Sequence, residues 1–355
     1  MAKQSFFPIK FITKKFFLII ILILSIFPKY LHSSQGEIND FGIIGLMYHR
    51  FEENKYPSTN IRMEDFKKHL QIITDHNIKF VSADQFSTSI VEEANKKKVL
   101  LTIDDGFLSF YENAWPILKE RKIPFILFVS TREVGNSGYM TWDQIREIAK
   151  EKFVHIGHHS HSHEYLVDEK IENIKKDILT ANKIFKKELG SISKFFSYPF
   201  GEYSNDFKKL IEEFGFQYAF GQHSGVIDGT KNVYELPRFP INEKYGKIER
   251  FNTIIKTLPL KYEFIKPEEK YLNDSTNPPK VTIKFAENYN LKQLNCFSNE
   301  NDKWRQSKID FISDNTIKIN IEEKFITERG RINCSLRESN GSYRWLGIQF
   351  VIAEK

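Results

Sequence analysis

The stretch VLLTIDDGF, residues 99–107, decides the fold of this chain. Five apolar or β-branched residues, Val99 to Ile103, are followed directly by two carboxylates and a glycine. A short run of this kind, bounded by turn residues, is typical of a strand that is buried on both faces of a parallel sheet. From Gly42 to about Pro240 similar runs alternate with amphipathic segments. This alternation predicts β/α units on a largely parallel sheet, and therefore an α/β fold.

The predicted elements follow from these two kinds of segment. Strands are expected over Ile43–Tyr48, Val99–Ile103, Pro124–Ser130, Val154–Gly157, Phe195–Tyr198, Tyr218–Gly221 and Tyr234–Arg238. Apolar residues at helical spacing predict helices over Met63–Asp75, Leu108–Glu120 and Asp168–Leu189, the last ending at Gly190. Thr141 and Gln144 form a capping box for a further helix through Lys150. Seven strands in series fit a barrel better than an open sheet, although periodicity alone does not decide between them.

Composition divides the chain into four parts. Residues 1–36 are predicted to be a signal peptide or N-terminal anchor, and residues 37–265 to be the α/β domain, which we expect to be catalytic. Residues 266–280 are rich in Pro, Asn, Asp and Ser and are predicted to be a linker. Residues 281–355 hold short alternating runs separated by Asn, Asp and Gly, which predict a small antiparallel β accessory domain.

The first 36 residues have the three-part pattern of a secretory signal. Lys14 and Lys15 precede the apolar run Phe16–Phe27, and a polar segment with Ser33 and Ser34 follows. The run is shorter than the roughly 20 residues that span a bilayer, so cleavage is favoured over anchoring. We therefore expect an exported protein, periplasmic or extracellular, with an inner-membrane anchor only if the leader is retained.

The basic charge of the chain belongs to this leader. Residues 1–34 hold five lysines and no acidic residue, so the remainder carries a net charge of only +1, against +6 for the whole chain. A nucleic-acid-binding domain would carry its basic residues within the folded part. The sequence therefore predicts no nucleic-acid partner.

Two cysteines, Cys296 and Cys334, lie in strand-like contexts near the C-terminus. In an exported protein they are expected to form one disulfide, and the alternative is a pair of buried free thiols. Neither has a basic neighbour in the sequence that would lower its pKa, so neither is expected to be catalytic.

Asp104 and Asp105 stand at the end of the strand quoted above, where barrels hold their active sites. Two adjacent carboxylates at such a strand end can divide their work, one binding a cation and the other acting as a base. The alternative is a plain turn, because Asp-Asp-Gly is ordinary turn composition.

A histidine cluster, residues 158–163, follows another predicted strand. His159 and His163 are spaced i and i+4, which would direct both toward one metal ion within a single helical turn. A surface histidine tract that scavenges metal is the alternative. Spacing alone does not choose among His158, His159, His161 and His163. Because both motifs follow strands, a shared metal site is the favoured interpretation.

A third segment, FFSYPFG at residues 195–201, ends a further strand with Pro199 and Gly201. These residues stiffen a rim loop and expose backbone N–H groups, which can stabilise an oxyanion. On its own the segment would be interpreted as a plain strand-to-helix turn.

Together the three segments resemble the polysaccharide deacetylase, or NodB-homology, family of carbohydrate esterases (family 4). Thr102–Gly106 matches the T-x-D-D-G motif, His159–His163 matches H-S/T-x-x-H, and Ser197–Gly201 approaches R-x-P-Y/F-G. The opening Leu46–Arg50 also looks like the exported subgroup that includes poly-N-acetylglucosamine deacetylases. The resemblance covers roughly residues 42–241.

The resemblance implies a distorted (β/α)₇ barrel and the metal-dependent removal of N-acetyl groups from an N-acetylglucosamine-containing polysaccharide. It implies that Asp105, His159 and His163 bind one divalent cation, usually zinc, with cobalt and nickel as alternatives. Asp104 would be the general base. Tyr198 and Phe200 would contribute the oxyanion and substrate contacts, through a backbone N–H near Phe200.

The chain departs from the family pattern in two places. The Arg that opens the third motif is Ser197 here, and Arg238 is the candidate replacement, with a surface pair to Glu235 as the alternative. No late L-x-H motif supplies the His that protonates the leaving amine. His223 is the first candidate for that role, and His49 is a weaker one.

Three other functions remain open from the sequence. The same site chemistry can hydrolyse another amide or an O-acetyl ester. A catalytically weak glycan-binding or export-associated protein is a second possibility, in which Trp304, Tyr343, Trp345 and Phe350 stack on sugar rings. An Asp-His-His set also matches the ligands of non-haem iron oxygenases, although the additional Asp104 and the export signal argue against that class.

Overall fold

The computed structural model describes residues 41–91 and 96–353. The predicted leader, residues 1–36, therefore lies outside the described residues. The described residues belong to one compact unit. Within the described ranges, no helix has both the length and the apolar character needed to cross a membrane.

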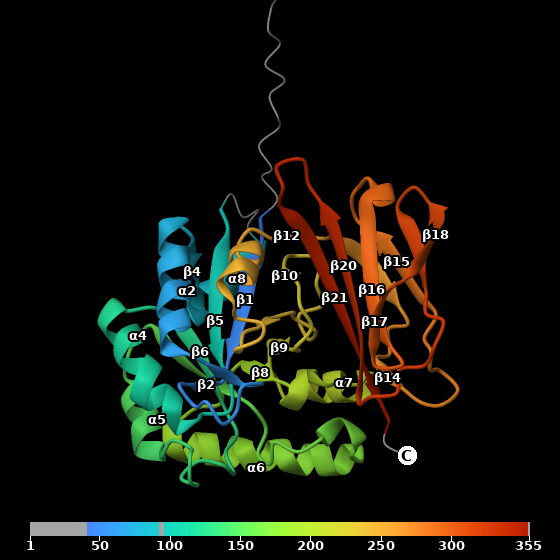
Figure 1. The fold of residues 1–355 in the computed structure, drawn as a ribbon. Helices are drawn as coiled ribbons and strands as arrows, with labels where there is room; N and C mark the ends of the chain where they lie inside the picture. Colours follow the sequence, from blue (N-terminus) through green and yellow to red (C-terminus); the bar gives the residue numbers. More distant parts are fainter. Residues whose placement is uncertain (1–40, 92–95, 354–355) are drawn as a thin grey trace, which may run out of the picture. The chain divides into compact units, whose positions relative to one another are not determined.

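A nine-stranded sheet forms the N-terminal part of this unit (Figure 1). Its strands run in the order β10-β1-β5-β6-β7-β8-β9, and neighbours from β1 to β9 are parallel. The α/β fold class is therefore confirmed. The strands are β1 (Ile43–Tyr48), β4 (Lys79–Phe80), β5 (Lys98–Ile103), β6 (Phe125–Val129), β7 (Val154–His158), β8 (Phe195–Ser197), β9 (Tyr218–Phe220), β10 (Val226–Ile227) and β11 (Phe239–Pro240).

Helices cover one face of this sheet, and Figure 1 shows α2, α4 and α5 along it. The predicted α2 has the same bounds in the structure, α5 begins with the predicted capping box, and α6 ends at Gly190 in the left-handed conformation. The segment predicted as one helix from Leu108 is a π-helix, Phe110–Ala114, followed by α4. The helices are α2 (Met63–Asp75), α3 (Ala83–Val91), α4 (Trp115–Arg121), α5 (Trp142–Ala149), α6 (Ile171–Leu189), α7 (Asn205–Glu213) and α8 (Ile248–Ile254).

Both faces of the sheet are buried, as the unbroken apolar runs predict. Alternate strand residues such as Leu46, Leu101 and Leu127 pack with the helices. The residues between them, such as Leu100 and Phe128, form a separate cluster on the inner face of the sheet. The strand register therefore decides which residues at the strand ends point inward.

The segment after β10 connects the two ends of the sheet. Leu236 bridges to Phe220 of β9, and Phe239 pairs with Leu46 of β1. The prediction of a strand over Tyr234–Arg238 is wrong, because only the bridge at Leu236 and the two-residue β11 are formed. This segment runs close enough to β9 and β1 to form single β-bridges, but its path is too irregular for a continuous β-ladder.

The C-terminal β region, which we define as residues 258–353, consists of two further sheets. The larger has the order β12-β21-β20-β16-β17, with β14 beside β21, and the smaller has the order β13-β15-β19-β18. Their apolar faces share one core cluster. The strands are β12 (Leu258–Pro259), β13 (Tyr262–Lys266), β14 (Tyr271–Leu272), β15 (Val281–Phe285), β16 (Leu294–Glu300), β17 (Lys303–Gln306), β18 (Lys308–Ser313), β19 (Thr316–Asn320), β20 (Arg329–Arg337) and β21 (Tyr343–Ile352). A separate pair, β2 (Arg50–Phe51) and β3 (Asn60–Ile61), precedes α2.

The structure differs from the predicted linker over residues 266–280. Strand β14 lies inside that range and pairs with β21, while β12 and β13 precede it and already belong to the two β sheets. Pro and Asn residues interrupt the strands here, but they do not separate the α/β part and the β region into two independent domains. The disulfide prediction is confirmed, because Cys296 and Cys334 are opposite each other on β16 and β20 and are bonded.

The β region packs directly on the α/β part through β21. Leu346 bridges to Gly225, and the Gln349 amide donates a hydrogen bond to the Gly201 carbonyl at 3.3 Å. A side chain at Gly347 would meet the Ser224 carbonyl oxygen at 2.3 Å, so a glycine is required for this approach. Strand β21 thus holds the two parts together beside the strand ends of the parallel sheet.

Candidate metal centre and catalytic cavity

The strand register brings three predicted or neighbouring site residues to the inner side of the sheet. Asp104 continues the inward series Leu100 and Thr102, and Ser197 continues from Phe195. His159 follows Gly157, whose Cβ position lies against Phe128 of the inner cluster. These residues come from separate strands and meet because parallel strands end at the same edge.

Asp105, His159 and His163 form a cluster whose ligand atoms all lie within 4.8 Å of one another. Asp105 Oδ1 is 3.2 Å from His159 Nε2 and 3.1 Å from His163 Nε2. One carboxylate and two imidazoles make a three-ligand set that leaves positions for water and substrate on a divalent ion. The structure therefore brings together the three residues that the resemblance implies as ligands.

The atoms facing the centre of this cluster lack partners among the described residues. Asp105 Oδ1 and His159 Nε2 are buried without a hydrogen-bond partner. His159 Nδ1 is 2.7 Å from the Ser197 carbonyl oxygen, which fixes the proton on Nδ1 and leaves the Nε2 lone pair free. A bound cation would satisfy both orphaned atoms, so these residues fit the divalent metal that the resemblance implies.

The backbone around the site is held in unusual conformations. Asp105, Ser160, His163 and Phe200 have φ values of 74°, 68°, 53° and 57°. Non-glycine residues in this left-handed region cost free energy and concentrate at functional sites. Four such residues around one cluster indicate that the local fold is arranged for the positions of these groups.

The structure separates the four histidines of residues 158–163. His158 is fully buried among Phe185, Phe196 and Phe216, away from the cluster. The His161 ring lies 2.8 Å from the Thr131 hydroxyl. Only His159 and His163 join Asp105. The conformation of the loop therefore determines which of the four histidines face Asp105, a question that their spacing alone left open.

Asp104 lies behind the cluster and is held by Arg238. The guanidinium donates two hydrogen bonds to the Asp104 carboxylate, at 2.7 and 2.8 Å, and both side chains are fully buried. Ser197 Oγ accepts from Arg238 at 2.8 Å and donates to Asp104 at 3.2 Å. Asp104 Oδ2 is 4.0 Å from His159 Nε2. Arg238 therefore orients the carboxylate beside the metal cluster.

The replacement of the family's Arg by Ser197 is explained by this arrangement. The small serine leaves room for a guanidinium that enters from the other side, and Gly45 on β1 allows the approach, since a Cβ there would lie 3.2 Å from Arg238 Cγ. Arg238 pairs with Asp104, whereas Glu235 pairs with Lys208. The alternative of a surface pair between Arg238 and Glu235 is therefore excluded.

The charges around Asp104 keep it ionised. Burial raises the pKa of this carboxyl, but the Arg238 charge and the Arg238 hydrogen bonds lower it, and the net pKa lies below its usual value. For Asp105, burial likewise raises the pKa, and His163 and His159 bring it well below the usual value. Both groups are thus carboxylates at neutral pH, as a ligand and a base must be.

A cavity of about 590 Å³ opens on the metal cluster. Asp105, His163, His49, His223 and Phe200 line it, together with residues of the β region. A volume of this size lies in the usual range of ligand-binding clefts. The other β-region and loop residues on its wall include Arg250, Trp304, Arg329, Arg331, Asn333, Trp345 and Gly347.

The two residues predicted from the third motif lie in different places. Phe200 lines the cavity and packs on His163 and Tyr165, with ring centroids 4.8 and 4.1 Å apart. Tyr198 is fully buried beside Phe196 and Phe207, and its N–H donates to the Phe220 carbonyl. Phe200 is therefore placed to contact a substrate, and the Tyr198 side chain is not.

Sequence reasoning missed several residues that shape the site. Asp177 on α6 accepts hydrogen bonds from the backbone N–H groups of His161 and Ser162, at 2.7 and 3.0 Å, and so fixes the histidine loop. Arg331 was not singled out, and Trp304 and Trp345 were considered only for a separate accessory domain. In the sequence, Asp177 looks the same as any exposed acidic residue on a helix, so no pattern singles it out.

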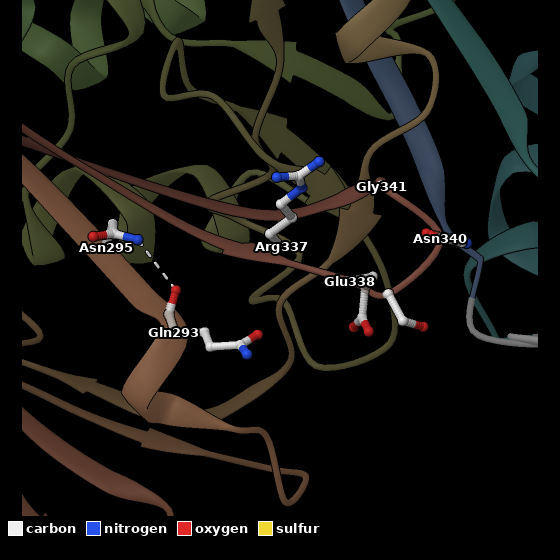
Figure 2. Close-up of a pocket in the computed structure, with 7 residues that line it drawn as sticks. Gln293, Asn295, Arg337, Glu338, Asn340 and Gly341 are labelled. Carbon is white, nitrogen blue, oxygen red and sulfur yellow. Dashed lines mark hydrogen bonds between the residues drawn. The ribbon is translucent and has the colours of Figure 1, made fainter.

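A second, more open pocket of about 790 Å³ lies at the β20–β21 turn (Figure 2). Its residues include Gln293, Asn295, Arg337, Glu338 and Asn340, and the Asn295 amide donates to the Gln293 carbonyl at 3.2 Å. Among the residues that line it there is no histidine and no cysteine. It therefore lacks the groups for a second site of the same chemistry.

Comparison with known proteins gives a consistent picture. The model of the family described as polysaccharide deacetylase matches residues 91–219, which include Asp104, Asp105 and the histidine loop. A Staphylococcus aureus (strain MSSA476) protein named poly-beta-1,6-N-acetyl-D-glucosamine N-deacetylase is 26% identical over 198 residues, covering 52% of this chain and 68% of that protein.

Solved structures share the fold. IcaB from Ammonifex degensii superposes with a TM-score of 0.55 at 24% identity, covering 61% of this chain and 97% of that one. The Streptococcus pyogenes deacetylase PplD gives a TM-score of 0.55 at 20% identity, covering 61% and 99%. In both cases more than a third of this chain lies outside the match.

Proposed function

We propose that this chain is a polysaccharide deacetylase, a metal-dependent hydrolase that removes N-acetyl groups from an N-acetylglucosamine-containing polysaccharide. The family model that matches residues 91–219 and the similar Staphylococcus aureus deacetylase support this proposal. The observation that carries the proposal is the Asp105–His159–His163 cluster with Asp104 held beside it by Arg238. The distorted (β/α)₇ barrel remains part of this proposal, supported by the bridges that join β9 and β1 through residues 236–239.

The proposed metal is zinc, with cobalt or nickel as alternatives, because two imidazoles and one carboxylate suit these ions. When bound, the ion would acidify a water molecule and polarise the acetyl carbonyl. Asp104 is proposed to take up the proton of the attacking water. Its fixed position and its charge at neutral pH are what a general base needs. Phe200 is proposed to donate its backbone N–H to the developing oxyanion.

The leaving amine needs a proton, and two imidazoles on the cavity wall are candidates. The charges of Asp105 and Asp104 act on His49, whereas the charged groups around His223 are Glu235, Lys270, Lys231 and Arg238. Burial lowers the pKa of both rings, to about 4 for His223, whereas the carboxylates of Asp105 and Asp104 oppose this effect at His49. These surroundings favour His49 over His223 as the proton donor.

We expect His49→Ala to lower kcat for acetate release by about 10²-fold, the usual contribution of a general acid. His223→Ala is the matched variant on the same cavity wall, and its kcat is expected to fall less than tenfold. Single-turnover kinetics on both variants check this. A larger loss for His223→Ala would return the role to His223.

The first test of the function is acetate release. The purified full-length protein, loaded with zinc or cobalt, is expected to release acetate from β-1,4 or β-1,6 N-acetylglucosamine oligomers. Chelation is expected to abolish the release, and added zinc to restore it, because the orphaned atoms of Asp105 and His159 are then satisfied again. Silence from metal-loaded protein on all oligomers would reject the proposal and favour another acyl substrate.

We further propose that the protein is exported and acts in the periplasm or outside the cell, with membrane attachment only through an uncleaved leader. The Cys296–Cys334 disulfide supports this, because disulfides persist in oxidising compartments. The proposed partner is the polysaccharide substrate, and no nucleic acid is expected.

A further inference from the structure

The catalytic cavity has a wall that the matched family segment does not supply. Trp304, Arg329, Arg331 and Trp345 all line the cavity together with Asp105 and His163, yet they belong to the β region. The family match ends at residue 219. The cavity of this chain is therefore built by two parts, and the β region faces the position where substrate would lie.

The register of the large β sheet explains which residues form this wall. Residues with even numbers on β20, such as Ile332 and Cys334, belong to the apolar core. The odd-numbered Arg329, Arg331 and Asn333 line the cavity. The Arg331 N–H donates to the Asn299 side chain on β16, and Asn299 is paired with Trp304 on β17. One polar and aromatic row thus runs across three strands.

The wall carries positive charge that is not balanced within the cavity. Arg250, Arg329 and Arg331 line it, and the one carboxylate among the lining residues is Asp105, which belongs to the metal cluster. Arg329 pairs with Glu202 at 2.5 Å. In the described part of the chain no carboxylate lies within ion-pair distance of Arg331 or Arg250, and Arg250 donates to the carbonyls of Pro240 and Tyr245 instead.

The unpaired Arg331 is costly without a ligand. It is partly buried, and burial and the neighbouring Arg329 lower its pKa. A guanidinium presents a planar fork of donors that matches a carboxylate or a phosphate, and partial burial strengthens such a contact. Near it, Trp304 is 53% exposed and offers an aromatic face on which a sugar ring can stack.

We propose that this wall is a subsite for the sugars that flank the reacting residue, and that it recognises an anionic substituent, a carboxylate or a phosphate, on the glycan. The inference rests on the proposed deacetylase function and specifies its substrate class. Arg331 binds the anion, Arg250 adds positive charge, and Trp304 supports a neighbouring sugar ring. The reacting N-acetyl group lies at the metal cluster in the same cavity.

The experiment compares three matched hexamers of N-acetylglucosamine in the linkage that the acetate assay identifies. One is neutral, one carries carboxymethyl groups and one carries phosphate groups. For the full-length, metal-loaded protein we expect kcat/KM on at least one charged hexamer to exceed that on the neutral one by about tenfold, the effect of one charge-assisted contact. The two charged hexamers distinguish carboxylate from phosphate.

Arg331→Gln is expected to reduce this charged-to-neutral ratio about tenfold, chiefly through KM, and Arg331→Lys to reduce it less. Arg337→Gln is the matched control, because Arg337 lies on the same strand outside the cavity and lines the second pocket (Figure 2). The ratio of the control is expected to equal that of the wild type. Equal losses in the Arg331 and Arg337 variants would overturn the proposal.

The two proposals fail in different ways. If the wild type prefers the neutral hexamer or does not discriminate, the anion subsite is rejected and the deacetylase function stands. If no hexamer releases acetate, the deacetylase function is rejected, and binding isotherms then decide the subsite. Equal affinities for neutral and charged hexamers would reject it, whereas tighter binding of a charged hexamer that weakens with salt would support it.

Discussion

Replacing Asp104 with asparagine is expected to lower kcat for acetate release by about 10³-fold, because a positioned general base contributes 10² to 10⁴ in rate. Asparagine keeps the shape of the side chain but cannot take up a proton. Asp105, His159 and His163 are unchanged, so the variant is expected to bind the metal as the wild type does. Initial rates and metal content measured on the same preparation check both statements.

A control must separate lost chemistry from lost stability, since Asp104→Asn also leaves Arg238 without its counter-charge. Asp228→Asn serves this purpose. Asp228 is buried and paired with Lys231, but it does not line the cavity. It is expected to lose stability while kcat stays within about twofold. Full activity in Asp104→Asn, or equal losses in the two variants, would rule out Asp104 as the base.

Arg238→Gln is expected to lower the free energy of unfolding by about 3–5 kcal/mol, because breaking a buried ion pair from one side leaves an uncompensated charge. Both side chains of this pair are fully buried, and the guanidinium also binds Thr102, Ser197 and the Gly221 carbonyl. Equilibrium urea unfolding measures the change. We also expect activity to fall, since Asp104 loses the group that orients it.

Arg146→Gln is the comparison for this prediction. Arg146 pairs with Asp143 and Glu188 on the surface, with 39% of its side chain exposed, and such pairs contribute about 1 kcal/mol or less. The double variant Asp104→Asn/Arg238→Gln is expected to be more stable than the sum of the single changes predicts, because no lone charge remains. A loss below about 1 kcal/mol for Arg238→Gln would contradict the proposed role of the pair.

Local patterns predicted the parts of the fold that local physics controls. Strand β1 and helix α2 have the predicted bounds. An unbroken apolar run is best buried as a strand, and apolar residues with a 3.6-residue period are best buried on one face of a helix. The Asp105–His159–His163 cluster was also predictable, since Asp105 and His159 closely follow strands β5 and β7, whose ends meet at one edge of the sheet. Only the choice among the four histidines needed the structure.

The remaining features depend on contacts between distant segments. Nothing in the neighbourhood of Arg238 indicates that it reaches Asp104, 134 positions away, because Gly45 and Ser197 make the space on two other strands. Strand β14 has only two residues and lies between Pro267 and Pro278, so residues 266–280 read as a linker until β14 pairs with β21. The cavity wall at Arg331 likewise exists only after β21 docks.

Strand β21 sets an order of events for this protein. It follows all other described strands in the chain, it lies between β12, β14 and β20, and its Trp345 and Gly347 complete the cavity. During synthesis the metal ligands emerge well before this strand does, so the ligands can gather while the cavity still lacks a wall. The cavity is therefore complete only after this C-terminal strand has docked.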